Sequence, residues 1–127
     1  MCVYVYARHN AIIYFLKGDV SAVQFFETEL FLNASRPCIS SITALELLSY
    51  APLPQSEEKA INDFLDIVSV VPVDIQIARI AGSLRRSYKI KSPDAAIAAT
   101  ALFTGTTIAT RNVRDFRQIV DLNLKKI

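Results

Sequence analysis

Short apolar runs alternate with amphipathic segments along the chain. Five runs have the β-branched or continuously apolar character of strands: Val3–Ala7, Pro37–Ile39, Val68–Val71, Thr106–Ala109 and Leu122–Ile127. Between them, apolar residues recur at helical spacing, and capping residues stand where those segments begin. Strands that alternate with helices predict one three-layer α/β domain over residues 1–127, with a central, mostly parallel sheet flanked by helices.

Several helix boundaries can be predicted from capping chemistry. Ser92-Pro93-Asp94 indicates a helix start with a serine cap, and Gly105 indicates where that helix ends. Ser40, Ser41 or Thr43 should cap the helix that carries Leu45, Leu47 and Leu48, and Arg114–Ile119 should form a short helix. Asn10 and Asp19 should cap two helices that run up to Gly18 and from Val20 to Asn33.

Composition limits the class of protein. The chain has 127 residues, 52% of them hydrophobic and 20% charged, which suits a single packed domain and excludes a disordered chain. No apolar run approaches the roughly 20 residues that a membrane-spanning helix needs. The N-terminal residues lack the basic region of a secretory signal, and Cys2 and Cys38 lack metal-ligand spacing. We therefore expect a cytoplasmic protein with no membrane partner.

The candidate chemistry is narrowed by what the chain lacks. It has one histidine, His9, and its three glycines are isolated, so neither a zinc cluster nor a Gly-rich phosphate loop can form. Carboxylate chemistry with a hard divalent cation remains. Glu46, Asp94 and Asp115 stand near helix starts that follow strands, where active sites of open α/β sheets form. Each also has a structural interpretation, because Thr43 with Glu46 and Asn112 with Asp115 fit capping boxes, and Asp94 complements a helix dipole.

Three segments resemble the acid-bearing segments of PIN-domain nucleases of the VapC type: Ile42 to Leu48, Ser92 to Ala101 and Thr110 to Phe116. Ile77 to Arg86 is also similar to that branch. The resemblance implies a PIN-like fold and an endoribonuclease site that uses Mg²⁺ or Mn²⁺. It assigns Glu46, Asp94 and Asp115 as catalytic and metal-binding residues, with Asn10, Thr110 and Asn112 as supporting polar groups. It also implies an RNA substrate, a VapB-type antitoxin partner and a homodimer.

Basic residues gather in two segments near the predicted site. One runs from Arg79 to Lys91 and the other from Arg111 to Arg117, and both should border the acidic groove. Within them, Arg85, Arg86, Arg111 and Arg114 are the candidates for contacts with RNA phosphates. The acids of the segment after Pro54 gather elsewhere, at Glu57, Glu58, Asp63 and Asp66. An ordinary solvated helix face is the alternative interpretation of each basic cluster.

One family residue is missing. Members begin with a strand followed by Asp-Thr-Asn, and alignment on Asn10 places their first acidic ligand at Arg8 and the threonine at His9. A guanidinium has no lone pair to offer a cation and stays protonated, so the site should be weakened or inactive as written. Permitted codons allow a one-base frameshift whose repair would give Met-Tyr-Met-Leu-Asp-Thr-Asn; natural divergence is the alternative. A non-catalytic PIN-fold module that binds antitoxin or RNA therefore remains open, as does a plain scaffold whose acids only cap helices.

Overall fold

The strands form one parallel sheet. A computed structural model describes residues 4–6, 38–49, 55–110 and 112–126. Its strands are β1 (Tyr4–Tyr6), β2 (Cys38–Ser40), β3 (Ser69–Val71), β4 (Thr107–Thr110) and β5 (Leu124–Lys126), in the order β3-β2-β1-β4-β5. Every pairing between neighbours is parallel, which confirms the predicted α/β class with a parallel sheet.

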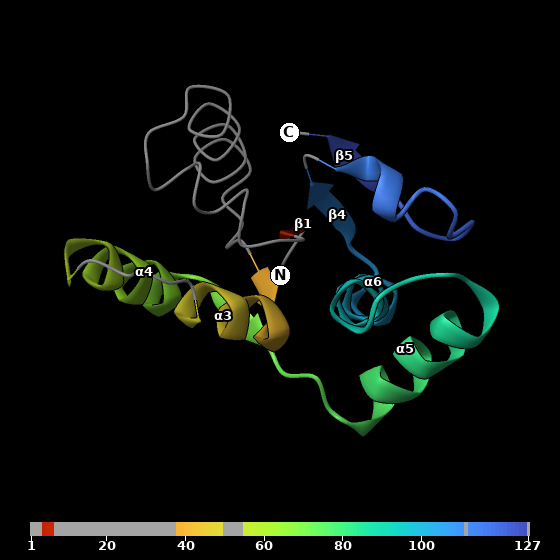
Figure 1. Ribbon diagram of the computed structural model, residues 1–127, viewed down its shortest axis with the longest axis horizontal. Helices are drawn as coiled ribbons and strands as arrows, with labels where there is room; N and C mark the ends of the chain where they lie inside the picture. Colours follow the sequence, from red (N-terminus) through yellow and green to blue (C-terminus); the bar gives the residue numbers. More distant parts are fainter. Residues whose placement is uncertain (1–3, 7–37, 50–54, 111, 127) are drawn as a thin grey trace.

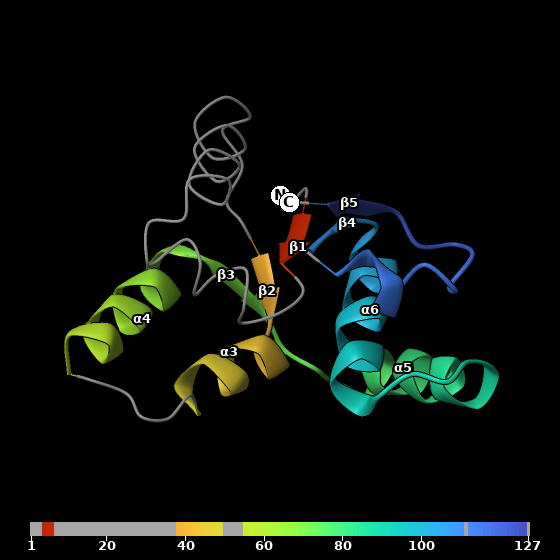
Figure 2. The same ribbon diagram turned by 45° about the horizontal axis from the view of Figure 1, so that its top comes forward.

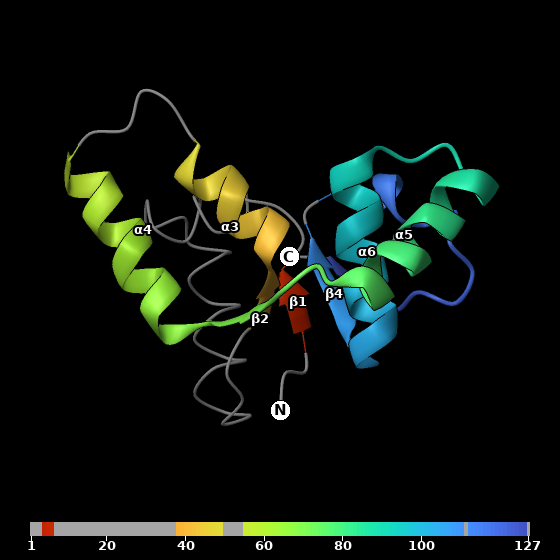
Figure 3. The ribbon, with the colours of Figure 1, turned by 90° about the horizontal axis from the view of Figure 1, so that it is seen from below.

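Helices lie to both sides of the central strand. They are α3 (Ser41–Leu48), α4 (Gln55–Ile67), α5 (Ile75–Ser87) and α6 (Ser92–Thr104). Figure 1 shows α3 and α4 on one side of the molecule and α5 and α6 on the other, and Figures 2 and 3 show the same division. Helix α6 packs against β1, β2 and β4, and α5 covers α6 from outside. No described helix is long and apolar enough to span a membrane.

Helix α6 forms the centre of the core. Ala95, Ala98 and Ala99 are completely buried, and they belong to a cluster that includes Ile108 and Phe116. Small side chains let a helix approach its neighbours closely, so α6 fits between the sheet and α5 without voids. A helix that is apolar on all sides is typical of such a buried position.

The ends of α5 and α6 are set by local chemistry. Asp74 Oδ1 accepts a hydrogen bond from the backbone N–H of Ile77 at 3.0 Å and so caps α5. Helix α6 ends at Gly105, which adopts the left-handed conformation at φ 66°. The N–H of Thr106 donates to Ala101 O at 2.9 Å, the reverse-turn bond of a Schellman motif. The predicted end of this helix at Gly105 is confirmed.

Two local predictions are wrong, although the predicted start of a helix at Ser92 is confirmed. The segment expected to form a helix over Arg114–Ile119 contains only the 3₁₀ turn η2 (Val113–Asp115), because so short a segment gains too few helical hydrogen bonds to offset its nucleation cost. Ser92 does not cap α6: it is the first helical residue, Lys91 occupies the cap position, and Ser92 Oγ accepts a hydrogen bond from Arg85 instead. The helices predicted between Asn10 and Asn33, together with Cys2, lie outside the described residues.

Candidate metal and RNA site

The sheet brings distant acids toward one edge. Because all strands are parallel, their carboxyl ends lie together, and β1 stands between β2 and β4. Tyr6 at the end of β1 pairs with Ile39 in β2 and with Ala109 in β4. Glu46 lies in α3, directly after β2, and Asp115 follows β4. Positions 8, 9 and 10, which carry the predicted Arg8, His9 and Asn10, lie outside the described residues.

Asp94 and Asp115 line the same pocket. This pocket of about 360 Å³ is lined by Lys89, Ile90, Lys91, Asp94, Asn112, Arg114, Asp115 and Gln118. Asp94, in the first turn of α6, is only 4% exposed, and Asp115 is half-buried. Burial of a carboxylate costs free energy, because the group loses its hydration, and an almost buried carboxylate adds little to solubility. These two acids, far apart in sequence, therefore form a shared polar centre.

A chain of hydrogen bonds positions Asp115. Thr110, buried at the end of β4, accepts a hydrogen bond at Oγ1 from the N–H of Asn112 at 3.0 Å. Asn112 in turn donates from Nδ2 to Asp115 Oδ2 at 3.0 Å. The capping-box interpretation of Asn112 is wrong, because its side chain makes no cap hydrogen bond to η2 and contacts the carboxylate instead. Both predicted supporting residues of this segment thus connect β4 to an acid of the pocket.

Glu46 occupies a different position from the other two acids. It is half-buried in α3 with its Oε1 shielded from solvent, and it is not among the residues that line the pocket. Its capping-box interpretation is also wrong: Ser40 caps α3 by accepting from the N–H of Ile42 at 3.1 Å, and Thr43 is a buried residue within the helix. Helix α3 packs against α6, which carries Asp94.

The chemistry of the pocket fits a hard cation in part. Carboxylate and amide oxygens are hard ligands, and Mg²⁺ binds through one or two carboxylates while it keeps several waters. Asp94 and Asp115 supply such a pair, with Asn112 beside them. Within residues 4–6, 38–49, 55–110 and 112–126, no three His, Cys, Asp or Glu side chains are close enough to hold one ion.

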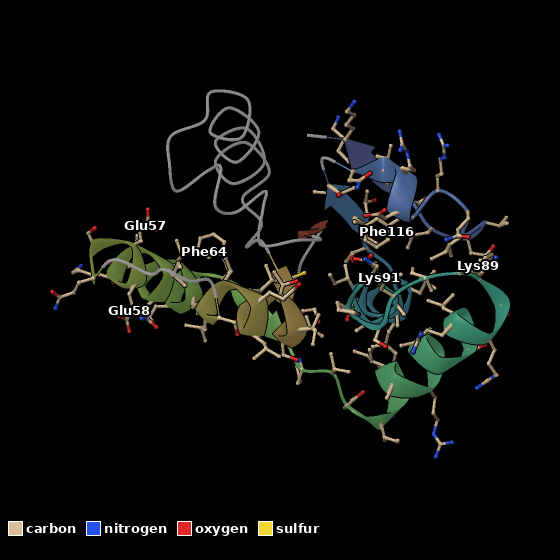
Figure 4. All side chains as sticks on the ribbon, viewed as in Figure 1. Glu57, Glu58, Phe64, Lys89, Lys91 and Phe116 are labelled. Atoms are coloured by element: carbon tan, nitrogen blue, oxygen red, sulfur yellow. The ribbon has the colours of Figure 1, made fainter. Side chains whose placement is uncertain are left out.

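The four predicted RNA-contacting arginines are placed differently. Arg114 lines the pocket, and Arg86 is exposed on α5. Arg85 donates from Nη1 to Ser92 Oγ at 2.9 Å and from Nε to Ile90 O at 3.1 Å. Arg111 lies outside the described residues. The acids of α4 are remote: Figure 4 shows Glu57 and Glu58 at the opposite end of the molecule from Lys89.

Sequence reasoning expected the segment from Arg79 to Lys91 to border the acids, but it did not single out which of its residues line the pocket, and it missed Gln118 altogether. Lys89, Lys91 and Gln118 line it beside the acids. The lysines stood in a basic segment, but nothing in the sequence distinguished them from the neighbouring arginines. Gln118 carried no signal, because a single glutamine fits no motif. Figure 4 shows Lys91 at the start of α6 and Lys89 nearer the end of α5 in the connection between the two helices.

The parallel sheet and its pocket of carboxylates indicate the class of protein to which the chain belongs. The PIN-domain family model matches residues 9–122, and the chain belongs to the PIN-domain family. Within that family it falls with the VapC-type ribonucleases. It is 35% identical over 112 residues to Ribonuclease VapC19 of Mycobacterium tuberculosis, and the alignment covers 84% of this chain and 87% of that protein. It is 31% identical to the tRNA(fMet)-specific endonuclease VapC of Salmonella typhimurium, over 74% of this chain and 77% of the relative.

A solved structure supports the same placement. DNA-bound VapBC from Salmonella typhimurium contains a chain that matches with a TM-score of 0.84 and 25% identity, over 99% of this chain and 98% of that one. The expected PIN-like fold of the VapC type is confirmed.

Proposed function

We propose that this chain is the ribonuclease toxin of a VapBC-type toxin–antitoxin pair, with a metal-dependent endoribonuclease site that Arg8 weakens. The observation that carries the proposal is the pocket in which Asp94 and Asp115 lie among Lys89, Lys91 and Arg114. Carboxylates suit a divalent cation, and the surrounding cations attract a phosphate backbone to it. Few other functions require both charges in one small pocket.

The chain's own residues would divide the work. Asp94 and Asp115 would hold Mg²⁺ or Mn²⁺, while Glu46 lies in α3, which packs against α6, and does not line the pocket. Asn112 keeps Asp115 oriented through the bond at 3.0 Å. Arg114, together with Arg111 three residues before it and Arg86 on α5, would hold RNA phosphates. The bound cation would polarise the scissile phosphate and lower the pKa of a water that attacks it.

The proposed partners follow from the relatives. The similar structure from Salmonella typhimurium is a VapBC complex bound to DNA. For this chain we propose a VapB-type antitoxin that covers the pocket, and assembly as a homodimer. Co-expression with a VapB-type antitoxin, followed by co-purification and measurement of the complex mass, tests both.

Arg8 favours a second candidate, a PIN-fold module that binds RNA or antitoxin without cleavage. An arginine at the family's first acidic position adds a positive charge where a cation would bind. The two candidates differ in whether the acids and a bound metal ion support cleavage of RNA.

The test is an RNA-cleavage assay of the purified chain with Mg²⁺, with Mn²⁺ and with a chelator. The toxin proposal predicts weak cleavage that needs the metal and disappears in Asp94→Asn, which keeps the side chain's shape and removes its charge. RNA binding with no cleavage under any metal condition, in the chain as written and after Arg8→Asp, would support the binding module. Cleavage that survives in chelator, or in Asp94→Asn, would contradict the proposed site.

A further inference from the structure

The connection between α5 and α6 presents two lysines in a fixed way. Lys89 and Lys91 are exposed and line the pocket, whereas Ile90 between them is buried and belongs to the core cluster. Burial of Ile90 fixes the direction of the chain there, because a reversal of the alternation would place an isoleucine in water and a lysine ammonium in the core. The two charged side chains are therefore directed to the pocket by packing.

Side-chain hydrogen bonds hold this connection from two directions. From α5, Arg85 donates from Nε to Ile90 O at 3.1 Å and from Nη1 to Ser92 Oγ at 2.9 Å. From the segment that precedes β5, Gln118 donates from Nε2 to Lys89 O at 3.2 Å. A loop whose carbonyls are bonded to side chains of two other segments loses little further entropy when a ligand binds.

An RNA phosphate that approaches the two acids needs fixed positive charges beside them. Asp94 and Asp115 repel an RNA phosphate at close range, so a substrate needs fixed cations beside them before any metal contributes. Lysine ammonium groups bind phosphates as point charges without reading the bases. Among the described residues, Lys89 and Lys91 line the pocket from the connection before α6, and Arg114 lines it from the segment after β4.

We infer that Lys89 and Lys91 form a preorganised phosphate-binding edge that receives the RNA backbone next to the acids, and that Arg85 positions this edge and does not itself bind RNA. The inference rests on the proposed function for its ligand, single-stranded RNA. It assigns Arg85 a positioning role because its guanidinium donates to Ile90 and Ser92, the residues that flank Lys91.

The salt dependence of binding separates contact from positioning. Each phosphate contact on a single strand contributes about 0.7 to the slope of log K against log salt concentration. In chelator, with a labelled single-stranded RNA and the full chain, Lys89→Ala/Lys91→Ala should reduce that slope by about 1.4. Arg85→Ala should weaken binding several-fold and leave the slope unchanged. Ser92→Ala, which removes one acceptor of Arg85, should show a smaller loss of the same kind.

A matched control removes two positive charges elsewhere. Lys59, which pairs with Asp63 on α4 at 2.9 Å, and Arg79, exposed on α5, do not line the pocket. Lys59→Ala/Arg79→Ala should leave the slope within error of the parent. Thermal melts of all variants are the check that each is folded under the binding conditions.

Several outcomes would overturn the inference. An unchanged slope in Lys89→Ala/Lys91→Ala would exclude these lysines as phosphate contacts, even where cleavage persists. A reduced slope in Arg85→Ala would make Arg85 a contact residue. An equal fall of the slope in the control would show a general effect of net charge. Failure of the proposed function has a different signature: no metal-dependent cleavage in any variant, while the slopes change as expected.

Discussion

Asn112 donates a hydrogen bond from Nδ2 to Asp115 Oδ2 at 3.0 Å, while its own backbone N–H is held by Thr110 at the end of β4. The carboxylate is thereby connected to the sheet by two successive short bonds. Partners that orient a metal-binding carboxylate are a large part of a metal site's affinity. This relationship ties the geometry of the pocket directly to the last residue of a central strand.

Asn112→Ala should lower the affinity for Mn²⁺ by about 10- to 100-fold, since Asp115 loses the donor that fixes its orientation. Titration calorimetry in an Arg8→Asp background measures the effect. Asn123→Ala, an exposed asparagine before β5, is the control and should leave affinity unchanged. Equal affinity in Asn112→Ala and its parent would show that the bond has no role in metal binding.

Arg8→Asp should restore metal-dependent stability and RNA cleavage. The change replaces a fixed positive charge with a carboxylate at the family's first ligand position, and divalent affinity rises with ligand charge. A ligand at a hundred times its Kd stabilises the folded state by about 2.7 kcal/mol, so Mn²⁺ should raise the melting temperature of the variant more than that of the parent. If neither stabilisation nor cleavage is gained, more than this one residue separates the chain from an active nuclease.

Gly105→Ala should destabilise the protein by about 1 kcal/mol, because φ at this helix end is 66° and an alanine there is strained. A Cβ at this position would meet no atom within 4 Å, so the cost comes from the backbone alone. Gly105→Asn should cost less, since asparagine tolerates the left-handed region better. Urea denaturation measures both; equal losses for the two variants would contradict a backbone origin.

Ala98→Leu should destabilise the fold by about 1–3 kcal/mol, because this completely buried position of α6 has no room for a larger side chain. Ala78→Leu, at an exposed position of α5, should change stability by less than about 0.5 kcal/mol. Denaturation midpoints of the two variants decide. A neutral Ala98→Leu would indicate a looser core around α6 than its burial implies.

The hydrophobic pattern predicted the elements well from position 38 onward, because burial sets the spacing of apolar residues in both strands and helices. The local capping signals were less reliable. Thr43 with Glu46, and Asn112 with Asp115, matched a capping box in sequence. In the first case Ser40 caps the helix instead of Thr43. In the second case the side chain of Asn112 donates to the carboxylate of Asp115 and does not cap η2. Short motifs leave such competition undecided, since several donors and acceptors lie within reach.

The pocket was only partly predictable. Asp94 and Asp115 were identifiable because each follows a helix-start or strand-end signal at the same edge of a parallel sheet. The roles of Ile90, Arg85 and Gln118 were not, because each depends on contacts across the fold: an anchor in the core, and side-chain bonds to a loop. Tertiary contacts of this kind have no periodicity in the sequence.

The central strand also determines when the protein can fold during synthesis. Tyr4 pairs with Thr107, which is translated much later, and β1 has its second neighbour only when β4 exists. Pairings so distant in sequence are slow to form, because the intervening chain must be ordered first. Asp94 and Asp115 both come after β1, β2 and β3 in the sequence, so a polypeptide that ends before Asp115 holds no completed pocket. A ribonuclease built on this order of assembly would be harmless to the ribosome and messenger that are producing it until the segment from β4 to Asp115 has been translated.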